Sequence, residues 1–171
     1  SINVDRDAFQ RRQWNVAVLD LDYQPVVAGT NGLVTYQSAG IDAGKIIANL
    51  LAIELSQLEN ITIVERSRIK ELVSEQQLQL SGMTSTTTAV ELGQLLGADA
   101  IVMGNVTDFI SWSSLAIVGS TVSYSMRLID VESGKIISSG SASKVGNYTV
   151  AFQNAQNLTR LLVKDMQANL H

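Results

Sequence analysis

The chain has 171 residues, 46% hydrophobic and 16% charged, which suits one folded domain with a sizeable core and excludes a disordered chain. Its net charge of −4, with scattered lysine and arginine, excludes the basic patch of a nucleic-acid-binding protein. No apolar stretch approaches the roughly 18 residues of a membrane helix, and the lack of cysteine excludes disulfides and thiolate chemistry.

The chain is predicted to begin with a strand and a helix. Residues 1–13 are expected to be an N-terminal extension, and the apolar run within residues 14–23 predicts a buried strand. Residues 25–40 carry glycines and an Asn-Gly pair, which predict a loop. Apolar residues at 3.6-residue spacing then predict a helix over residues 42–57.

A strand and two more helices follow. The apolar residues at 61–65 indicate a short strand, and helical spacing from Arg66 onward indicates a helix. Thr88 and Glu91 form a T-x-x-E capping box, which predicts that the next helix begins there. Gly97 is expected to end that helix.

The last third changes pattern. Residues 100–106 predict a strand, and strict alternation of apolar and polar residues at 122–128 predicts another strand with one exposed face. A turn leads into its hairpin partner at 135–144. Residues 149–170 predict a final helix with one apolar stripe.

The sum is the order βαβααβββα. It predicts an α/β fold in which residues 14–171 form one sandwich domain, a mixed β-sheet flanked by helices. Leu50 and Leu95 are expected in its core, where truncation of either to alanine should cost about 2–5 kcal/mol.

The first strand ends in two aspartates, Asp20 and Asp22, the D-x-D pattern that opens the sheet of some phosphatases. Such an enzyme also needs a threonine or valine just beyond, a lysine for the phosphoryl charge and a distal acidic pair for magnesium. Here residues 23–25 are Tyr-Gln-Pro, Lys45 is isolated, and no acidic pair follows a later strand. The pattern favours a scaffold strand with solvent-facing acids. A magnesium-dependent phosphatase using Asp20 and Asp22 is the alternative.

Other catalytic patterns are missing. The only histidine, His171, is the last residue, and no glycine-rich phosphate loop occurs. Matches to N-x-[ST] are as well explained by the abundance of serine and threonine; they begin at Asn60, Asn105, Asn147 and Asn157. The sequence therefore predicts no enzyme, no cofactor and no metal site.

A series of motifs in a fixed order carries a family resemblance. They are V-A-V-L-D at 16–20, V-E-R-S-R-I at 64–69, L-S-G at 80–82, L-G-Q-L-L-G-A-D at 92–99 and G-N-V at 104–106, with the hairpin R-L-I-D-V-E-S-G-K-I-I-S-S at 127–139. In this order the chain resembles the curli production assembly component (CsgG-like) family of bacterial cell-envelope proteins. The resemblance covers residues 14–145.

The resemblance implies a periplasmic domain associated with the outer membrane, with a lipid anchor expected upstream of Ser1. It would bind other envelope proteins or copies of itself, without nucleic acid, in secretion, assembly or envelope maintenance. Two roles stay open within this class. One is an accessory lipoprotein similar to the activators of peptidoglycan synthases, and the other is a subunit of a curli-type outer-membrane secretion channel.

One departure bears on the channel role. The family's channel carries two long amphipathic hairpins, which by motif alignment would follow Phe109 and Lys144. Here only residues 110–121 separate Phe109 from the alternating strand, and the final helix follows Lys144 closely. Because a spanning strand needs about 9–11 residues in each direction, we expect no membrane-spanning hairpin of its own.

Residues 109–118, F-I-S-W-S-S-L-A-I-V, are too apolar for a free loop. They either lengthen two neighbouring strands and pack under the last helix, or form an exposed apolar strip that binds a partner. In the second case the binding residues are Phe109, Trp112, Leu115 and Ile117.

The motif residues invite two interpretations as well. Glu65 can meet free N–H groups of the helix that follows, and Arg66 can bind a neighbouring carboxylate. The pair is then an architectural joint between strand and helix, or else a partner-facing patch. Gly97 and Gly104 are expected to meet backbone requirements.

Overall fold

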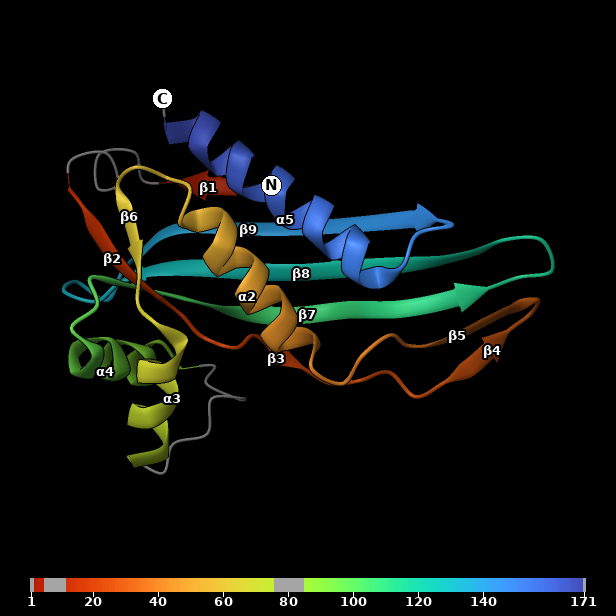
Figure 1. The fold of residues 1–171 in the computed structure, drawn as a ribbon, viewed down its shortest axis with the longest axis horizontal. Helices are drawn as coiled ribbons and strands as arrows, with labels where there is room; N and C mark the ends of the chain where they lie inside the picture. Colours follow the sequence, from red (N-terminus) through yellow and green to blue (C-terminus); the bar gives the residue numbers. More distant parts are fainter. Residues whose placement is uncertain (1, 5–11, 76–84, 171) are drawn as a thin grey trace.

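The computed structural model describes residues 2–4, 12–75 and 85–170 (Figure 1). The strands in these residues are β1 (Ile2–Val4), β2 (Trp14–Val18), β3 (Asp22–Tyr23), β4 (Gly29–Asn31), β5 (Val34–Ser38), β6 (Ile61–Ile63), β7 (Ala100–Ser113), β8 (Val118–Asp130) and β9 (Ile136–Asn147). The helices are α2 (Ala43–Leu55), α3 (Arg66–Glu75), α4 (Thr86–Leu96) and α5 (Ala151–Leu170).

Strand β7 organises the single mixed sheet. One edge of β7 pairs with antiparallel β8 along the whole strand. The other edge pairs in turn with β2 and β3, both parallel, and then with antiparallel β5. The order across the sheet is β1-β9-β8-β7-β2-β6, with β4 paired to β5. The predicted mixed sheet is confirmed, and the β8–β9 hairpin lies in it beside the strands of the first half.

The predicted order βαβααβββα is recovered as β2-α2-β6-α3-α4-β7-β8-β9-α5. Three elements are longer than predicted: β7 continues to Ser113, β8 starts at Val118 and β9 continues to Asn147. Strand β1 lies within the segment expected to be an extension, and it pairs with β9.

The prediction of a loop at residues 25–40 is wrong in part. Asn31-Gly32 does form a turn, with Gly32 at φ 61°, but that turn joins β4 to β5 in a hairpin. These strands are short, and their side chains are mostly exposed, so they carry little of the apolar signal that marks a strand. Their order comes from pairing with β7, a segment far away in the sequence.

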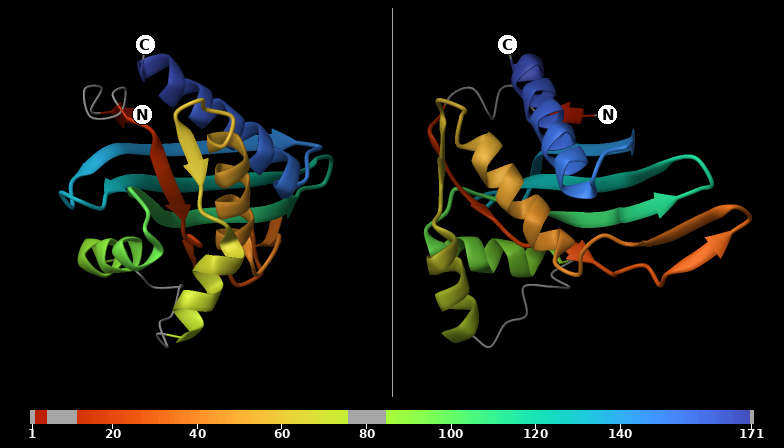
Figure 2. Two further views of the ribbon diagram at one scale, coloured as in Figure 1. Left: turned by 60° about the vertical axis from the view of Figure 1, so that its left-hand side comes forward. Right: turned by 45° about the vertical axis from the view of Figure 1, so that its right-hand side comes forward.

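The helices cover both faces of one end of the sheet (Figure 2). Because side chains alternate along a strand, Val102 and Val106 of β7 pack with α2 and α5, whereas Ile101 and Met103 pack with α3 and α4. A bulge between Val106 and Asp108 inserts one residue, which places Phe109 on the same side as Val106. No helix in residues 12–75 and 85–170 is both long and apolar enough to cross a membrane.

Helix α4 corrects two predictions. It begins at Thr86 after Ser85, so Thr88 and Glu91 lie inside the helix and do not cap it. Leu95 is 54% exposed and is not a core residue, whereas Leu50 is buried as predicted. At about 100° per residue, Leu95 lies outside the arc shared by Ala89, Leu92 and Leu96. Gly97 ends the helix in the left-handed conformation at φ 65°, as predicted.

Truncation of two leucines of α4, one at a time, should distinguish the buried face of the helix from its exposed face. Leu92 is 1% exposed, so Leu92→Ala should lower the free energy of unfolding by about 2–5 kcal/mol. Leu95→Ala should change it by less than about 1 kcal/mol, because little apolar surface is lost. Urea denaturation of both variants measures the difference, and equal losses would contradict this assignment of the helix faces.

A buried tyrosine should make the folded state less stable at alkaline pH. Tyr124 of β8 donates a hydrogen bond of 2.9 Å to Thr159 of α5, and burial raises the pKa of Tyr124 from 10.0 to about 12. The folded state therefore holds this proton more tightly than the unfolded chain does. The resulting stability is present below pH 10 and is lost as the pH rises towards 12.

Replacement of this residue tests the effect. At neutral pH, Tyr124→Phe should be about 1 kcal/mol less stable, because it loses the hydrogen bond. At about pH 11 the wild type should lose stability relative to the variant, since phenylalanine has no proton to release. Urea denaturation at both pH values gives this difference, and a gap that does not change with pH would contradict it.

Candidate partner-binding end of the sheet

The two aspartates after β2 have different environments. Arg66, the first residue of α3, donates hydrogen bonds to the Asp20 carboxylate and, at 3.1 Å, to the carbonyl of Val18. Asp22 lies in β3 and lines a polar hollow of about 440 Å³ with Asn105 and Arg127 among others. The Asp20 carboxylate thus serves to join the end of β2 to the start of α3.

The other residues of that motif are placed as follows. Glu65 is exposed and accepts a hydrogen bond of 3.4 Å from the Ser67 hydroxyl. Gly104 lies so close to the Ser125 carbonyl of β8 that a Cβ atom would collide with it. Within the described ranges, no cluster of three or more His, Asp or Glu side chains could hold a metal ion, and His171 lies outside them.

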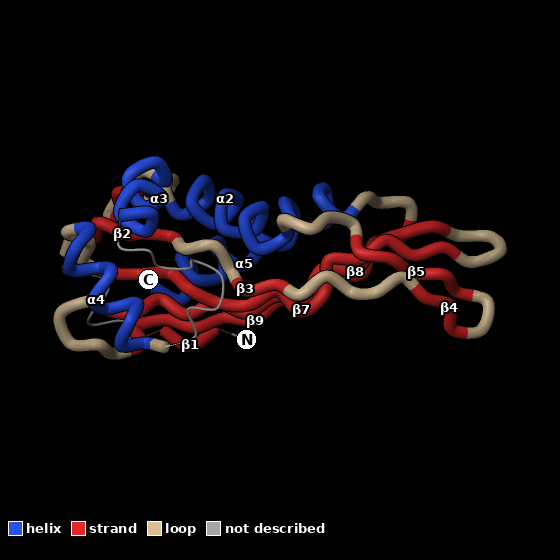
Figure 3. Tube along the Cα trace, turned by 90° about the horizontal axis from the view of Figure 1, so that it is seen from below, coloured by secondary structure: helices blue, strands red, loops and turns tan. Residues whose placement is uncertain are grey.

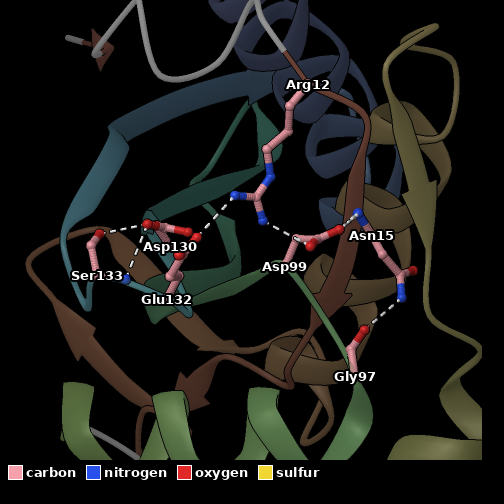
Figure 4. A network of polar contacts seen from close by, with 7 residues as sticks. All are labelled: Arg12, Asn15, Gly97, Asp99, Asp130, Glu132 and Ser133. Carbon is pink, nitrogen blue, oxygen red and sulfur yellow. Dashed lines mark hydrogen bonds and ion pairs between the residues drawn. The ribbon is translucent and has the colours of Figure 1, made fainter.

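Charged side chains form a network at the helix-covered end (Figure 4). Arg12 donates to Asp99 at 2.8 Å and to Glu132 at 3.5 Å, and its guanidinium lies 4.4 Å from the Trp14 ring centre. Asp99 also accepts the backbone N–H of Asn15 at 2.8 Å. More than a third of the Arg12 and Asp99 side chains is exposed, so these ion pairs add little stability. The network holds the N-terminal end of β2 against the start of β7.

The opposite end of the molecule is an arm without helices. The β4–β5 and β7–β8 hairpins lie side by side and run beyond the helix layer (Figure 3). We call these two hairpins, with the β9–α5 connection beside them, the distal arm. No charged residue occurs in its segments, 23–41, 109–126 and 145–150, although 16% of the chain is charged. The arm and the covered end thus differ sharply in charge.

The predicted apolar strip divides into core and surface. Phe109 is 2% exposed and belongs to the main core, so it is not available to a partner. Trp112 and Ile117 are half-buried, whereas Leu115, in the turn between β7 and β8, is 87% exposed. The strip therefore does lengthen two strands, and its far end also forms a surface.

A groove of about 380 Å³ lies on the arm. It is lined by β5, the end of β7, the start of β8 and the residues just before α5. Its apolar members are largely exposed: Val118 is 53%, Tyr148 73% and Val150 69% accessible. We call it the distal groove. Its lining combines these apolar side chains with hydroxyl groups such as those of Thr35, Ser111 and Ser113, which suits a side chain of another protein more than a reaction.

Comparison with known proteins places this arrangement in a family. The sequence profile described as the curli production assembly/transport component CsgG matches residues 10–115, more than half of the chain. The chain belongs to the CsgG family. No curated protein matches the sequence at a significant level.

Solved structures share the fold of this CsgG-family chain. PelC from Paraburkholderia phytofirmans, a dodecamer, is 16% identical, with a TM-score of 0.65 over 98% of this chain and 95% of that one. LpoB of E. coli is 14% identical, with a TM-score of 0.54 over 80% and 58%. Lipoprotein GNA1162 from Neisseria meningitidis is 21% identical, with a TM-score of 0.51 over 77% and 80%. Identities this low show a common fold.

Sequence reasoning missed half of the distal groove in this CsgG-family chain. The sequence places Val150 in the last helix, predicted over residues 149–170, and β5 in a loop, and it gives Tyr148 no role. A usable signal was present, because the arm segments 23–41 and 109–126 are the two longest stretches of the chain without charge. Their meeting at one end follows only from the sheet pairing.

The joint between β2 and α3 should be structural. Removing the Arg66 head group leaves Asp20, whose side chain is 22% exposed, without that ion pair. Arg66→Leu should therefore lower the free energy of unfolding by about 1–3 kcal/mol. Arg68→Leu, an exposed arginine on the same helix, is the matched control and should cost less than about 0.5 kcal/mol. Urea denaturation compares them, and equal effects would argue against the joint.

Proposed function

We propose that this CsgG-family chain is a non-enzymatic module of the bacterial cell envelope. It works in the periplasm at the outer membrane, held by a lipid anchor, and acts in secretion, assembly or envelope maintenance by binding copies of itself and other envelope proteins. Membership of a family described as an assembly and transport component supports this. So does the fold shared with lipoprotein GNA1162.

The observation that carries the proposal is the distal groove with its exposed rim of Val118, Tyr148 and Val150. Apolar side chains that stand around a hollow lose contact with water when a partner fills it. The occupant we propose is a second copy of the chain. PelC, which aligns with 98% of this chain, was solved as a dodecamer. A head-to-tail contact between copies joins two different surfaces of each subunit, and a groove is suited to be one of them.

We propose a module without membrane-spanning hairpins of its own. The β7–β8 hairpin continues for only a few residues beyond the buried Phe109 before it turns at Ser114. A strand that crosses a bilayer needs about 9–11 residues. A channel subunit is the second candidate, favoured by the transport role in the family's description. Ion conductance across planar bilayers by this chain alone would support that candidate and contradict the proposal.

The phosphatase alternative has no such support. The Asp20 carboxylate is bound by Arg66, and Arg66 also binds the backbone of β2. A guanidinium in this position competes with the magnesium ion that a D-x-D phosphatase places at its carboxylates. Absence of phosphatase activity with magnesium is the expected result, and activity lost in Asp20→Asn would overturn it.

Self-association through the groove can be tested without disturbing the core. Val118→Ser combined with Val150→Ser removes two exposed apolar side chains of the rim and should abolish association. The control is Ile53→Ser with Leu161→Ser, since these side chains are 59% and 57% exposed on α2 and α5. Sedimentation velocity should show oligomers for the wild type and the control, and monomers for the groove variant.

The melting temperature serves as the check on folding and is measured at a dilution at which all three proteins are monomeric, since association itself raises it. It should then be nearly the same in all three, because each changed side chain is exposed. A wild type that stays monomeric at every concentration would contradict the second copy as occupant. So would a groove variant that associates as well as the wild type does.

A further inference from the structure

The two hairpin tips of the distal arm are apolar and point away from the rest of the chain. Leu33 follows the Asn31-Gly32 turn between β4 and β5 and is 71% exposed. Leu115 lies in the turn between β7 and β8 and is 87% exposed. The two hairpins pair through β5 and β7, so both tips project together (Figure 2).

Aromatic side chains surround the arm just behind these tips. Tyr36 and Trp112 are cross-strand partners, both half-buried. Strand alternation places Trp112 on the opposite face of the sheet from Ser120, which packs against α5. Tyr148 lies at the edge of the groove and donates a hydrogen bond of 3.3 Å to the carbonyl of Ala116. Tyrosine and tryptophan are the residues enriched where a protein meets lipid headgroups.

The β7–β8 turn also satisfies part of its own backbone. The Ile117 carbonyl accepts both the Ser114 N–H at 2.8 Å and the Ser114 hydroxyl at 3.3 Å. The Ala116 carbonyl accepts the Tyr148 hydroxyl. Polar groups that enter an apolar phase need such partners, because no water is there to supply them.

We propose that the tips of the distal arm dock into the surface of a lipid bilayer. Leu33 and Leu115 enter the boundary of the acyl chains, and Tyr36, Trp112 and Tyr148 lie at the level of the headgroups. The arm segments contain no charged residue that would have to be desolvated. Two narrow convex turns suit a fluid surface better than a protein interface, which needs roughly 800 Å² from each partner.

Leu33 and Leu115, which enter the bilayer, do not line the groove, whereas Tyr36, Trp112 and Tyr148 do. The two tip leucines are therefore what distinguishes this docking from self-association through the groove. The envelope location proposed above supplies a membrane within reach, but the tips would bind lipid with or without self-association. The two proposals therefore fail in different experiments, one in sedimentation and the other in vesicle binding.

Vesicle flotation with the full chain tests the docking. The wild type should float with phosphatidylcholine vesicles, and Leu33→Ser with Leu115→Ser should reduce the partition coefficient about tenfold or more, since each leucine gives up its burial. Leu95→Ser is the matched control, a leucine 54% exposed on α4 outside the arm, and should float like the wild type. Because the tips lack cations, phosphatidylglycerol in the vesicles should not strengthen binding.

Tryptophan emission gives a second readout. Trp14 is 2% exposed in the core, so a change on adding vesicles reports Trp112. Because Trp112 also lines the groove, the measurement is made on both the wild type and the groove variant Val118→Ser with Val150→Ser, in which self-association is removed. We expect a blue shift, and quenching by phosphatidylcholine with brominated acyl chains. The proposal is overturned if the wild type binds none of these vesicles, or if the tip variant binds them as well as the wild type does. It is also overturned if Leu95→Ser loses as much binding, or if the tip variant loses only self-association.

Discussion

The antiparallel pairing of β7 with β8 is the constraint on which the rest of this structure depends. It runs from Ala100 opposite Asp130 to Ser113 opposite Val118, and thus from the helix-covered end to the bare arm. Near the first end, alternating side chains of β7 enter two cores, one with α2 and α5 and one with α3 and α4. The bulge after Val106 lets Phe109 close the larger core. Beyond it, backbone pairing continues with little apolar packing to support it.

The two ends of this sheet therefore have different chemistry. Carboxylates and arginines gather at the covered end, where Arg12 binds Asp99 and Arg66 binds Asp20. These ion pairs join the ends of neighbouring strands and helices. Each charged group in them is partly exposed to water and also contacts a group of opposite charge. The arm has no charge, and its exposed side chains are valine, leucine and aromatic residues among hydroxyl groups. A surface of this kind gains from leaving water, which is why contacts are proposed there and not at the aspartates.

The groove and the tips offer two surfaces on a single support. Val118 and Val150 face the groove beside the start of α5, whereas Leu33 and Leu115 stand at the ends of the hairpins. If copies join through the groove, every copy presents its tips in the orientation set by that contact. Membrane docking of one copy then favours docking of the next, because linked weak contacts reinforce one another. An envelope module can in this way be held at a membrane by an arm too short to cross it.

Local patterns in the sequence determined the helices, the strands of the core and the family, because apolar periodicity and the glycine that ends α4 act over a few residues. The sequence alone also indicated that Asp20 lacks the neighbouring residues that a D-x-D phosphatase needs. The tertiary structure alone decided what depends on distant pairing. The β4–β5 hairpin is ordered by β7, the N-terminal β1 by β9, and Leu95 is turned outward by the place of α4 against the sheet. The candidate surface belongs to this second group. Tyr36, Trp112 and Tyr148 lie in three uncharged segments that hydrogen bonds between strands bring to one end of the molecule. The residue pattern within one segment does not indicate which segments lie beside it in the sheet.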